Sequence, residues 1–180
     1  MLKNIKPEIA YRLINHGPVV LITTSDKNGK LNIMTLAWLT VVNTAPPLIA
    51  IAMGEQAYSQ KLIKKTKEFV INIPDKKLIK KVLYCGSHSG KNINKFKNTG
   101  LTPILSEKII PPKIKECLAH IECKVINQYK FSDVTLLISK IVCADVEEKV
   151  FDDYLRTEKI KTIHHLGGGW FAEIGKRFKL

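Results

Sequence analysis

The sequence has little that would mark a membrane protein or a secreted one. Its longest apolar runs, such as residues 46–53, are far shorter than the ~20 residues that a membrane-spanning helix needs. The start of the chain is charged and contains proline, which does not match a signal peptide. There are only four cysteines and none forms a CxxC pair, which fits a reducing compartment. We therefore expect a cytoplasmic protein that does not insert into a membrane.

Arginine is scarce, although lysine gives the chain a formal net charge of +13. Arginine reads bases and grips phosphates better than lysine, and no basic block is interleaved with aromatic residues as in single-strand binders. The lysines are spread from Lys3 to Lys179, so we predict no nucleic-acid partner. An anionic cofactor, an acidic protein partner, or simply a lysine-rich surface would each account for the charge.

Motifs for several other kinds of chemistry are also missing. No Ser-His-Asp set or carboxylate pair stands out, and no GxGxxG fingerprint follows an expected strand, which argues against a Rossmann domain. Cys117, His120 and Cys123 lie close in sequence, but the segment CLAHIECKV alternates like a strand. That alternation puts His120 on the face opposite both cysteines, so we predict no metal site.

What the sequence does contain is a series of strands with helices inserted singly. The regular alternation of strand and helix found in doubly wound parallel sheets is absent. Because there is also no repeat or linker, we predict one domain over residues 1–180, a β-rich antiparallel barrel with peripheral helices. The expected strands cover residues 19–24, 32–42, 48–53, 69–73, 104–110, 119–128 and 135–145, and the expected helices cover residues 6–15, 58–67, 76–84, 92–98 and 152–165.

The strand-like segment NIMTLAWLTVV, residues 32–42, carries polar groups although both of its faces are mainly apolar. A buried Asn or Thr needs a hydrogen-bond partner, which neighbouring backbone can supply. Small polar segments follow, however, at Tyr58-Ser59 and at residues 87–90, with Lys95 just beyond. Hydroxyls at a helix start together with a lysine suit a phosphate, so a flat aromatic ligand that carries a phosphate would use all of these groups.

The sequence resembles a known family, the flavin reductase-like proteins, which are FMN-binding split barrels that include flavoredoxins. The matching segments fall in order across nearly the whole chain, and together they are far more specific than any one of them. They are GPVVLITT, NIMTLAWLTVVNTAPPLIAIAM, YSQKLI, EFVINIP, CGSHSGKNINKF, GLT, ECLAHIECKV and LGGGWF.

The resemblance implies a homodimer of Greek-key split β-barrels with FMN near the subunit interface. Strand residues would line the flavin ring and ribityl chain, the segments around Tyr58 and Ser89 would meet the phosphate with Lys95, and Phe171 would cover the flavin. We expect replacement of Lys95 to weaken FMN binding while leaving the fold intact. By position, the cofactor-binding residues implied are Asn32, Thr35, Ala37, Trp38, Met53, Gly54, Tyr58, Ser59, Ser89, Gly90, Lys95 and Phe171.

Taken singly, several of these residues have simpler interpretations. Trp38 would be a core aromatic residue and Lys95 a solvated lysine. Outside the implied set, Cys85 reads as a buried inert thiol and His88 as an exposed loop histidine. His164 and His165 would be neighbours on the last helix and would not share a face, so they would not chelate a metal.

In function, the resemblance implies an FMN-dependent oxidoreductase, most simply an NAD(P)H-dependent flavin or ferric reductase. It would transfer hydride to FMN and electrons on to an acceptor, with the nicotinamide docked transiently. The alternative is a flavoredoxin-like electron carrier with little NAD(P)H activity, whose lysines would steer an acidic partner such as a ferredoxin. One departure bears on both: relatives often carry a histidine where this chain has Val134. The residues do not identify a catalytic side chain.

Overall fold

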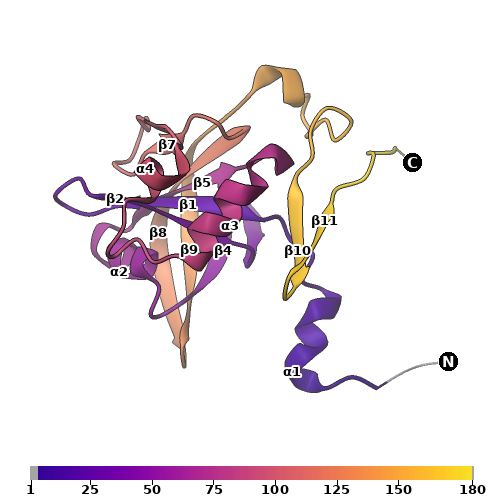
Figure 1. Cartoon of the computed structure of the whole chain (residues 1–180), viewed down its shortest axis with the longest axis horizontal. Helices are drawn as coiled ribbons and strands as arrows, with labels where there is room; N and C mark the ends of the chain where they lie inside the picture. The colour runs from indigo at the N-terminus through magenta and orange to yellow at the C-terminus, as the bar shows by residue number, and fades with distance from the viewer. Residues whose placement is uncertain (1–3, 180) are drawn as a thin grey trace.

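A computed structural model describes residues 4–179 of the chain (Figure 1). Its centre is a seven-stranded antiparallel sheet in the order β2-β1-β5-β8-β9-β4-β3. The strands are β1 (Val20–Ser25), β2 (Leu31–Leu36), β3 (Leu39–Thr44), β4 (Pro47–Gly54), β5 (Glu68–Ile73), β8 (Ala119–Phe131) and β9 (Val134–Val146).

Two small hairpins and several short helices surround this sheet. The hairpins pair β6 (Pro103–Ile104) with β7 (Lys113–Ile114), and β10 (Ile163–Gly167) with β11 (Trp170–Glu173). The helices are α1 (Pro7–Ala10), α2 (Tyr58–Thr66), α3 (Ile79–Ser87) and α4 (Lys95–Thr99), with 3-10 turns η1 (Tyr11–Leu13), η2 (Lys76–Leu78) and η3 (Glu148–Val150). In Figure 1 the hairpin β10–β11 lies beside α3, with α1 below it, and Ile163 of β10 packs in the same core as Val19 and Val82.

The order of the strands explains why the sheet closes on itself. β2 and β3 are its two edges, yet only Ala37 and Trp38 separate them in the chain. The sheet must therefore curl until its edges approach each other, which leaves a barrel that is split at this point. The β-rich antiparallel barrel with peripheral helices, predicted from the sequence, is confirmed.

Both faces of β1 are covered, and β2 is largely covered as well. The same burial was expected of the whole apolar segment 32–42, but its second half, in β3, is mostly exposed. Val20 and Ile22 point into the barrel interior with Phe69, where Ile63 of α2 packs among them. Leu21 and its neighbours point outward instead, into a second core formed with the helices α3 and α4. Further members of that second core are Ile33, Val82, Cys85, Phe96 and Ile114. Burial on both faces thus fixes α3 and α4 against β2.

The prediction of a helix over residues 152–165 is wrong. Asp153 adopts a positive φ of 75°, which ends any helix there, and the segment turns instead. Ile163–Gly167 then forms strand β10, and the hairpin reverses where Gly167 and Gly168 have φ of 112° and 57°. Leu155 and Ile160 of this segment pack instead in a small separate core.

Other differences from the sequence prediction are local. The single strand expected over residues 32–42 divides at Ala37–Trp38, where the barrel turns its corner. Residues 85–87 extend α3 instead of starting a loop, and most of residues 104–110 lies outside any strand. No helix within residues 4–179 combines the length and apolarity that crossing a bilayer would require.

Candidate functional site

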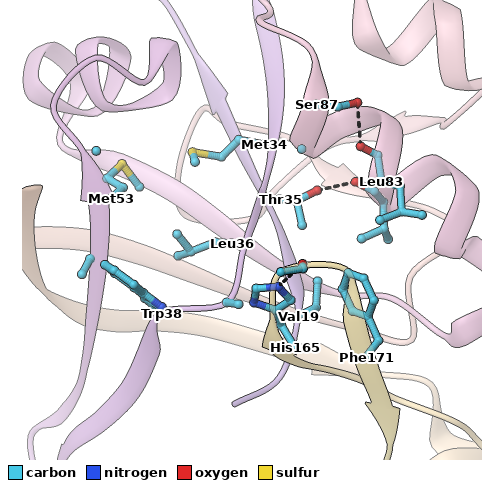
Figure 2. A pocket seen from close by; sticks show the side chains of 16 residues that line it. Val19, Met34, Thr35, Leu36, Trp38, Met53, Leu83, Ser87, His165 and Phe171 are labelled. Atoms are coloured by element: carbon cyan, nitrogen blue, oxygen red, sulfur yellow. Dashed lines mark hydrogen bonds between the residues drawn. The ribbon is translucent and has the colours of Figure 1, made fainter. Parts of the chain in front are cut away.

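Two adjoining pockets run along β2 and the end of α3, and they share Met34, Thr35, Gly86 and Ser87. The first, called here the apolar pocket, has a volume of about 570 Å³ (Figure 2). The second, the polar pocket, has a volume of about 290 Å³. The combined volume of the two pockets lies in the range that is typical of small-molecule and cofactor sites. One elongated ligand with an apolar half and a polar half would fill both.

The floor of the two pockets depends on a close approach of α3 to β2. Thr35 Oγ1 donates a hydrogen bond to the Val82 carbonyl at 2.5 Å. One turn later, a Cβ on Gly86 would lie 3.3 Å from the Thr35 Cβ. Because glycine has no side chain, the helix can sit this close and leave the pocket open above it.

The walls of the apolar pocket come from the barrel on one side and the β10–β11 hairpin on the other. Trp38 is 47% exposed and packs edge-on against Tyr11, with ring centroids 6.0 Å apart. Phe171 and His165 project from the hairpin toward the same space (Figure 2). Trp38 is therefore a half-exposed wall and not a core residue.

The polar pocket contains a buried asparagine with one unused polar atom. Asn32 is 2% exposed, and its Nδ2 donates to Ser59 Oγ at 2.8 Å. Its Oδ1 has no hydrogen-bond partner among residues 4–179. A Cβ on Gly90 would lie 1.7 Å from that oxygen, so only glycine fits where the loop crosses Asn32. An unsatisfied buried amide oxygen is costly unless a ligand or water completes it.

Helix α2 begins at the same pocket and carries no side-chain cap. Its N-cap is Ala57, and Tyr58 and Ser59 of its first turn line the pocket. The free N–H groups of a first helical turn, with the positive end of the helix dipole, favour an anion. Lys30 Nζ lies 5.4 Å from the centre of the Tyr58 ring and adds positive charge nearby.

Lys95 is not the solvated lysine that its sequence context allowed. It is 4% exposed, and its Nζ donates to the carbonyls of Ile33 at 2.8 Å and Cys85 at 2.6 Å. Burial lowers the pKa of Lys95. Since an ammonium has three N–H donors, one is left for a ligand in the polar pocket. Because this side chain ties β2 to α3, we expect its replacement to lower the stability of the fold as well as FMN affinity.

All twelve residues implied by the family resemblance line these two pockets. The apolar pocket takes Thr35, Ala37, Trp38, Met53, Gly54 and Phe171, and the polar pocket takes Asn32, Thr35, Tyr58, Ser59, Ser89, Gly90 and Lys95. Their individual contacts with FMN stay predictions. Val134, the departure from the family pattern, pairs with Gly54 at the end of β4.

Sequence reasoning missed several lining residues. Leu83 and Gly86 were assigned to separate elements, because the sequence prediction ended α3 one turn too early. His165 was placed on a helix that does not exist. A signal was present in both cases: the small-residue segment after Tyr84 suits close packing, and a Gly-Gly-Gly run between apolar segments suits a hairpin.

No group of three His, Cys, Asp or Glu side chains in residues 4–179 is arranged to hold a metal ion. His120 is engaged by Asp145 at 2.5 Å and by the Ile114 carbonyl at 2.8 Å. Cys117 and Cys123 belong to different hydrophobic cores. Burial raises the pKa of the Cys85 thiol to about 11, which makes that residue unreactive.

The sequence model of the flavin reductase like domain matches residues 12–164. The chain belongs to the flavin reductase-like family. A relative in this family is the uncharacterised Escherichia coli protein YddH, which is 33% identical over 174 residues covering 93% of this chain and 92% of YddH.

Two solved structures of this kind superpose on nearly the whole chain. Flavoredoxin of Desulfovibrio vulgaris (Miyazaki F) has a TM-score of 0.89 at 27% identity, covering 100% of this chain and 97% of its own. The FMN-binding domain of a flavin reductases-like enzyme from Shewanella baltica has a TM-score of 0.82 at 26% identity, covering 98% and 95%. The split-barrel fold expected from the sequence is thereby confirmed.

Proposed function

We propose that the protein binds FMN and acts as an oxidoreductase, with the flavin ring in the apolar pocket and the phosphate in the polar pocket. One observation carries the proposal: an apolar pocket continues directly into a polar one that ends at an uncapped helix and an unsatisfied Asn32 Oδ1. The family membership and the FMN-binding domain from Shewanella baltica support the same ligand.

The polar pocket suits a phosphate with its ribityl chain. The first-turn N–H groups of α2, the Ser59 hydroxyl and the remaining N–H of Lys95 are donors for phosphate oxygens. Asn32 Oδ1 is an acceptor, which matches a ribityl hydroxyl and not a phosphate. Gly90 packs closely against the Asn32 side chain, and any larger residue there would collide with this oxygen.

The apolar pocket suits a flat aromatic ring. Met34, Met53 and Leu83 offer apolar surface, and Trp38 and Phe171 offer aromatic surface. The Thr35 and Ser87 hydroxyls donate to backbone carbonyls. Their hydrogen bonds are therefore satisfied by the protein, and they do not leave unpaired polar groups against the ring. A ring seated there would be shielded from water on several sides, which strengthens every electrostatic contact that it makes.

Bound FMN would supply the redox chemistry, accepting a hydride from NAD(P)H and passing electrons on to an acceptor such as free flavin or ferric iron. This chain would position the flavin, keep water from it and hold its phosphate. Because the sequence carries no GxGxxG fingerprint, a nicotinamide would dock transiently at the open side of the apolar pocket.

An anaerobic titration tests this proposal. FMN-reconstituted protein is mixed with NADH and, separately, with NADPH, while the visible absorbance of the flavin is recorded. We expect rapid bleaching of bound flavin by at least one of the two donors. Flavin that stays oxidised with both donors would contradict the reductase activity, and absence of flavin binding would contradict the site itself.

A second candidate is an electron carrier that exchanges electrons with an acidic protein such as a ferredoxin. The net charge of +13 and the similarity to a flavoredoxin favour it. Electrostatic steering of this kind weakens as salt rises, because exposed charges are screened. We expect electron exchange with a reduced ferredoxin to slow strongly with ionic strength. A rate that does not depend on salt would argue against steering.

We also propose that the protein is a cytoplasmic homodimer. The edge strand β3 exposes Val41 (69%) and Val42 (47%), and the end of β8 exposes Phe131 (60%). Proteins normally cover an apolar edge strand by pairing or packing. A second copy of the chain would cover β3, which begins next to Trp38 in the sequence. Light scattering during size exclusion should give the mass of a dimer, and Val42→Lys should weaken it. A monomer that retains FMN would contradict an interface next to the site.

A further inference from the structure

The lining of the apolar pocket contains one ionisable side chain, that of His165. The other lining residues are apolar, glycine, or hydroxyls bonded to backbone carbonyls. Val134 is apolar and pairs with Gly54 at the rim. Any charge that develops on a ring in this pocket therefore has only His165 to meet it from the lining.

The orientation of the imidazole is fixed by the hairpin. His165 Nε2 lies 3.0 Å from the Gly168 carbonyl oxygen, and because a carbonyl only accepts, Nε2 carries the proton. The ring also packs on Phe171, its cross-strand partner, with centroids 5.2 Å apart. No protein group within residues 4–179 hydrogen-bonds its Nδ1, which leaves that atom available to a ligand.

We infer that His165 is the charge-compensating residue of the apolar pocket: in its imidazolium form it donates from Nδ1 to the bound ring and stabilises the reduced, negatively charged state. This inference rests on the proposed FMN binding and adds the residue that tunes it. Reduction puts negative charge on the flavin ring, and a fixed donor in a water-poor pocket stabilises such charge effectively.

No other charged side chain within residues 4–179 lines the apolar pocket. On η1, the Arg12 side chain lies over Gly167, and on β11 Glu173 is paired with Lys76 of η2. Helix α3 presents only uncharged side chains to the pocket. The two other histidines near the hairpin are engaged elsewhere: His164 Nδ1 donates to the His16 carbonyl at 2.9 Å, and the His16 imidazole lies 3.2 Å from the Leu13 carbonyl.

His164 provides a matched control on the same strand. Adjacent residues of a strand point to opposite faces, and His164 contacts Thr162 and His16 instead of lining the pocket. The test compares His165→Gln with His164→Gln. A glutamine amide can still donate to the Gly168 carbonyl from nearly the Nε2 position, so the hairpin keeps its hydrogen bond while the titratable group is lost.

The dissociation constants of oxidised FMN and of chemically reduced FMN are measured without oxygen, at about pH 6 and about pH 9, on either side of the range in which histidine normally titrates. At the lower pH, we expect His165→Gln to bind reduced FMN about tenfold more weakly than the unchanged protein, the size of a charge-assisted hydrogen bond. Oxidised FMN should bind equally well. At the higher pH the difference should vanish, and His164→Gln should match the unchanged protein throughout.

Equal affinity for reduced FMN in His165→Gln and the unchanged protein at both pH values would overturn the role of His165 and leave the proposed function standing. Failure of the unchanged protein to bind either form of FMN would overturn both. If His165→Gln does not fold, the nitrogen resonances of His165 in the unchanged protein decide: reduction of bound FMN must shift the Nδ1 signal, and an unshifted signal would refute the inference.

Discussion

Two buried asparagines, Asn32 on β2 and Asn72 on β5, differ in how the hydrogen bonds of their side-chain amides are satisfied. Asn72 is fully buried, and its amide is satisfied by protein: Nδ2 donates to the Leu21 carbonyl at 2.9 Å, and Oδ1 accepts from the Ile114 N–H at 2.8 Å. Asn32 is 2% exposed, uses its Nδ2 on Ser59, and leaves Oδ1 without a partner. The first is complete without a ligand, and the second is not.

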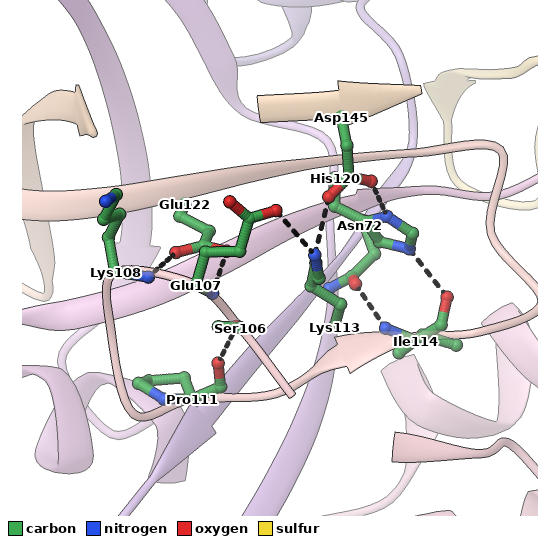
Figure 3. Close-up of polar contacts among 10 residues, drawn as sticks. All are labelled: Asn72, Ser106, Glu107, Lys108, Pro111, Lys113, Ile114, His120, Glu122 and Asp145. Atoms are coloured by element: carbon green, nitrogen blue, oxygen red, sulfur yellow. Dashed lines mark hydrogen bonds and ion pairs between the residues drawn. The ribbon is translucent and has the colours of Figure 1, made fainter. Parts of the chain in front are cut away.

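The region around Asn72 is a closed polar network (Figure 3). Glu122, 1% exposed, accepts the backbone N–H groups of Glu107 and Lys108, each at 2.7 Å. It thereby fastens the loop that crosses this side of the barrel. Lys113 Nζ donates to Asp145 at 2.7 Å, on the carboxylate that also meets His120.

The difference between the two regions separates structural polar groups from functional ones. A buried network in which every member is paired rigidifies the fold and offers nothing to a ligand. A buried polar atom left unpaired, beside an uncapped helix and an open pocket, marks a place where binding can recover the missing hydrogen bond. Composition does not distinguish them, because both contain Asn, Lys and hydroxyl side chains.

The largest expected effect comes from exchanging the two asparagines for alanine. Asn72→Ala leaves a buried N–H and carbonyl unpaired, so the free energy of unfolding should fall by about 3 kcal/mol. FMN affinity of the folded protein should not change. Asn32→Ala removes an amide that is already half unsatisfied, so we expect a loss of about 1 kcal/mol or less in unfolding free energy and about tenfold in FMN affinity.

Urea unfolding without ligand and flavin fluorescence titration measure the two quantities. The division into a structural Asn72 and a ligand-binding Asn32 would be contradicted by either of two results. One is that Asn32→Ala lowers the free energy of unfolding more than Asn72→Ala; the other is that Asn72→Ala weakens FMN binding while the protein remains folded.

Lys95→Met should affect both stability and binding. The substitution removes a buried ammonium that ties Ile33 to Cys85, and it leaves two carbonyls without donors. We expect about 2 kcal/mol lower unfolding free energy and about tenfold weaker FMN binding. Lys97→Met, at an exposed position on the same helix, is the control and should change neither. Intact FMN affinity in Lys95→Met would remove this residue from the phosphate site.

Gly90→Ala sharpens the comparison at one atom. Its Cβ would meet Asn32 Oδ1 at 1.7 Å, so Asn32 or the loop must move and the polar pocket narrows. We predict an FMN affinity about tenfold lower, together with a lower free energy of unfolding, because the buried Asn32 side chain or the loop must move. Gly175→Ala, which meets nothing within 4 Å, serves as the control. Equal affinities for the two variants would show that the pocket is not used.

The smallest effect concerns acid stability of the closed network. Burial alone would raise the pKa of Asp145, but hydrogen bonds from Lys113 and His120 outweigh it and hold the pKa below its usual value. A carboxyl with a lowered folded-state pKa stabilises the fold above its unfolded-state pKa and loses that contribution as the pH falls through the folded value. Asp145→Asn should therefore flatten the acid limb of a stability–pH profile by less than about 1 kcal/mol.

Calorimetric melting curves across the acid range would detect this difference. An acid limb as steep in Asp145→Asn as in the unchanged protein would assign acid stability to other carboxylates, and FMN affinity above the acid range should be the same in both.

Sequence patterns predicted most strands and the barrel class, and the family resemblance named twelve of the residues that line the two pockets. Apolar alternation and the Asn28-Gly29 turn fixed the β1–β2 hairpin correctly, because those signals are local. The β10–β11 hairpin was not predicted, although the Gly-Gly-Gly run suits a chain reversal, because the segment is held in place by distant parts of the chain: His164 bridges to Pro18 and Thr162 bridges to Asp75. His165 was missed for that reason. The burial of Lys95 was missed because its two partners lie 62 and 10 residues away in sequence.

The measurement that tests the central claim most directly is a parallel titration of the protein with FMN and with riboflavin, followed by flavin fluorescence. Riboflavin fills the apolar pocket but brings no phosphate to the α2 N-terminus and Lys95. We predict that FMN binds at one per chain and at least about tenfold more tightly than riboflavin. Equal affinity for the two, or no binding of either, would contradict the division of the site into a ring pocket and a phosphate pocket.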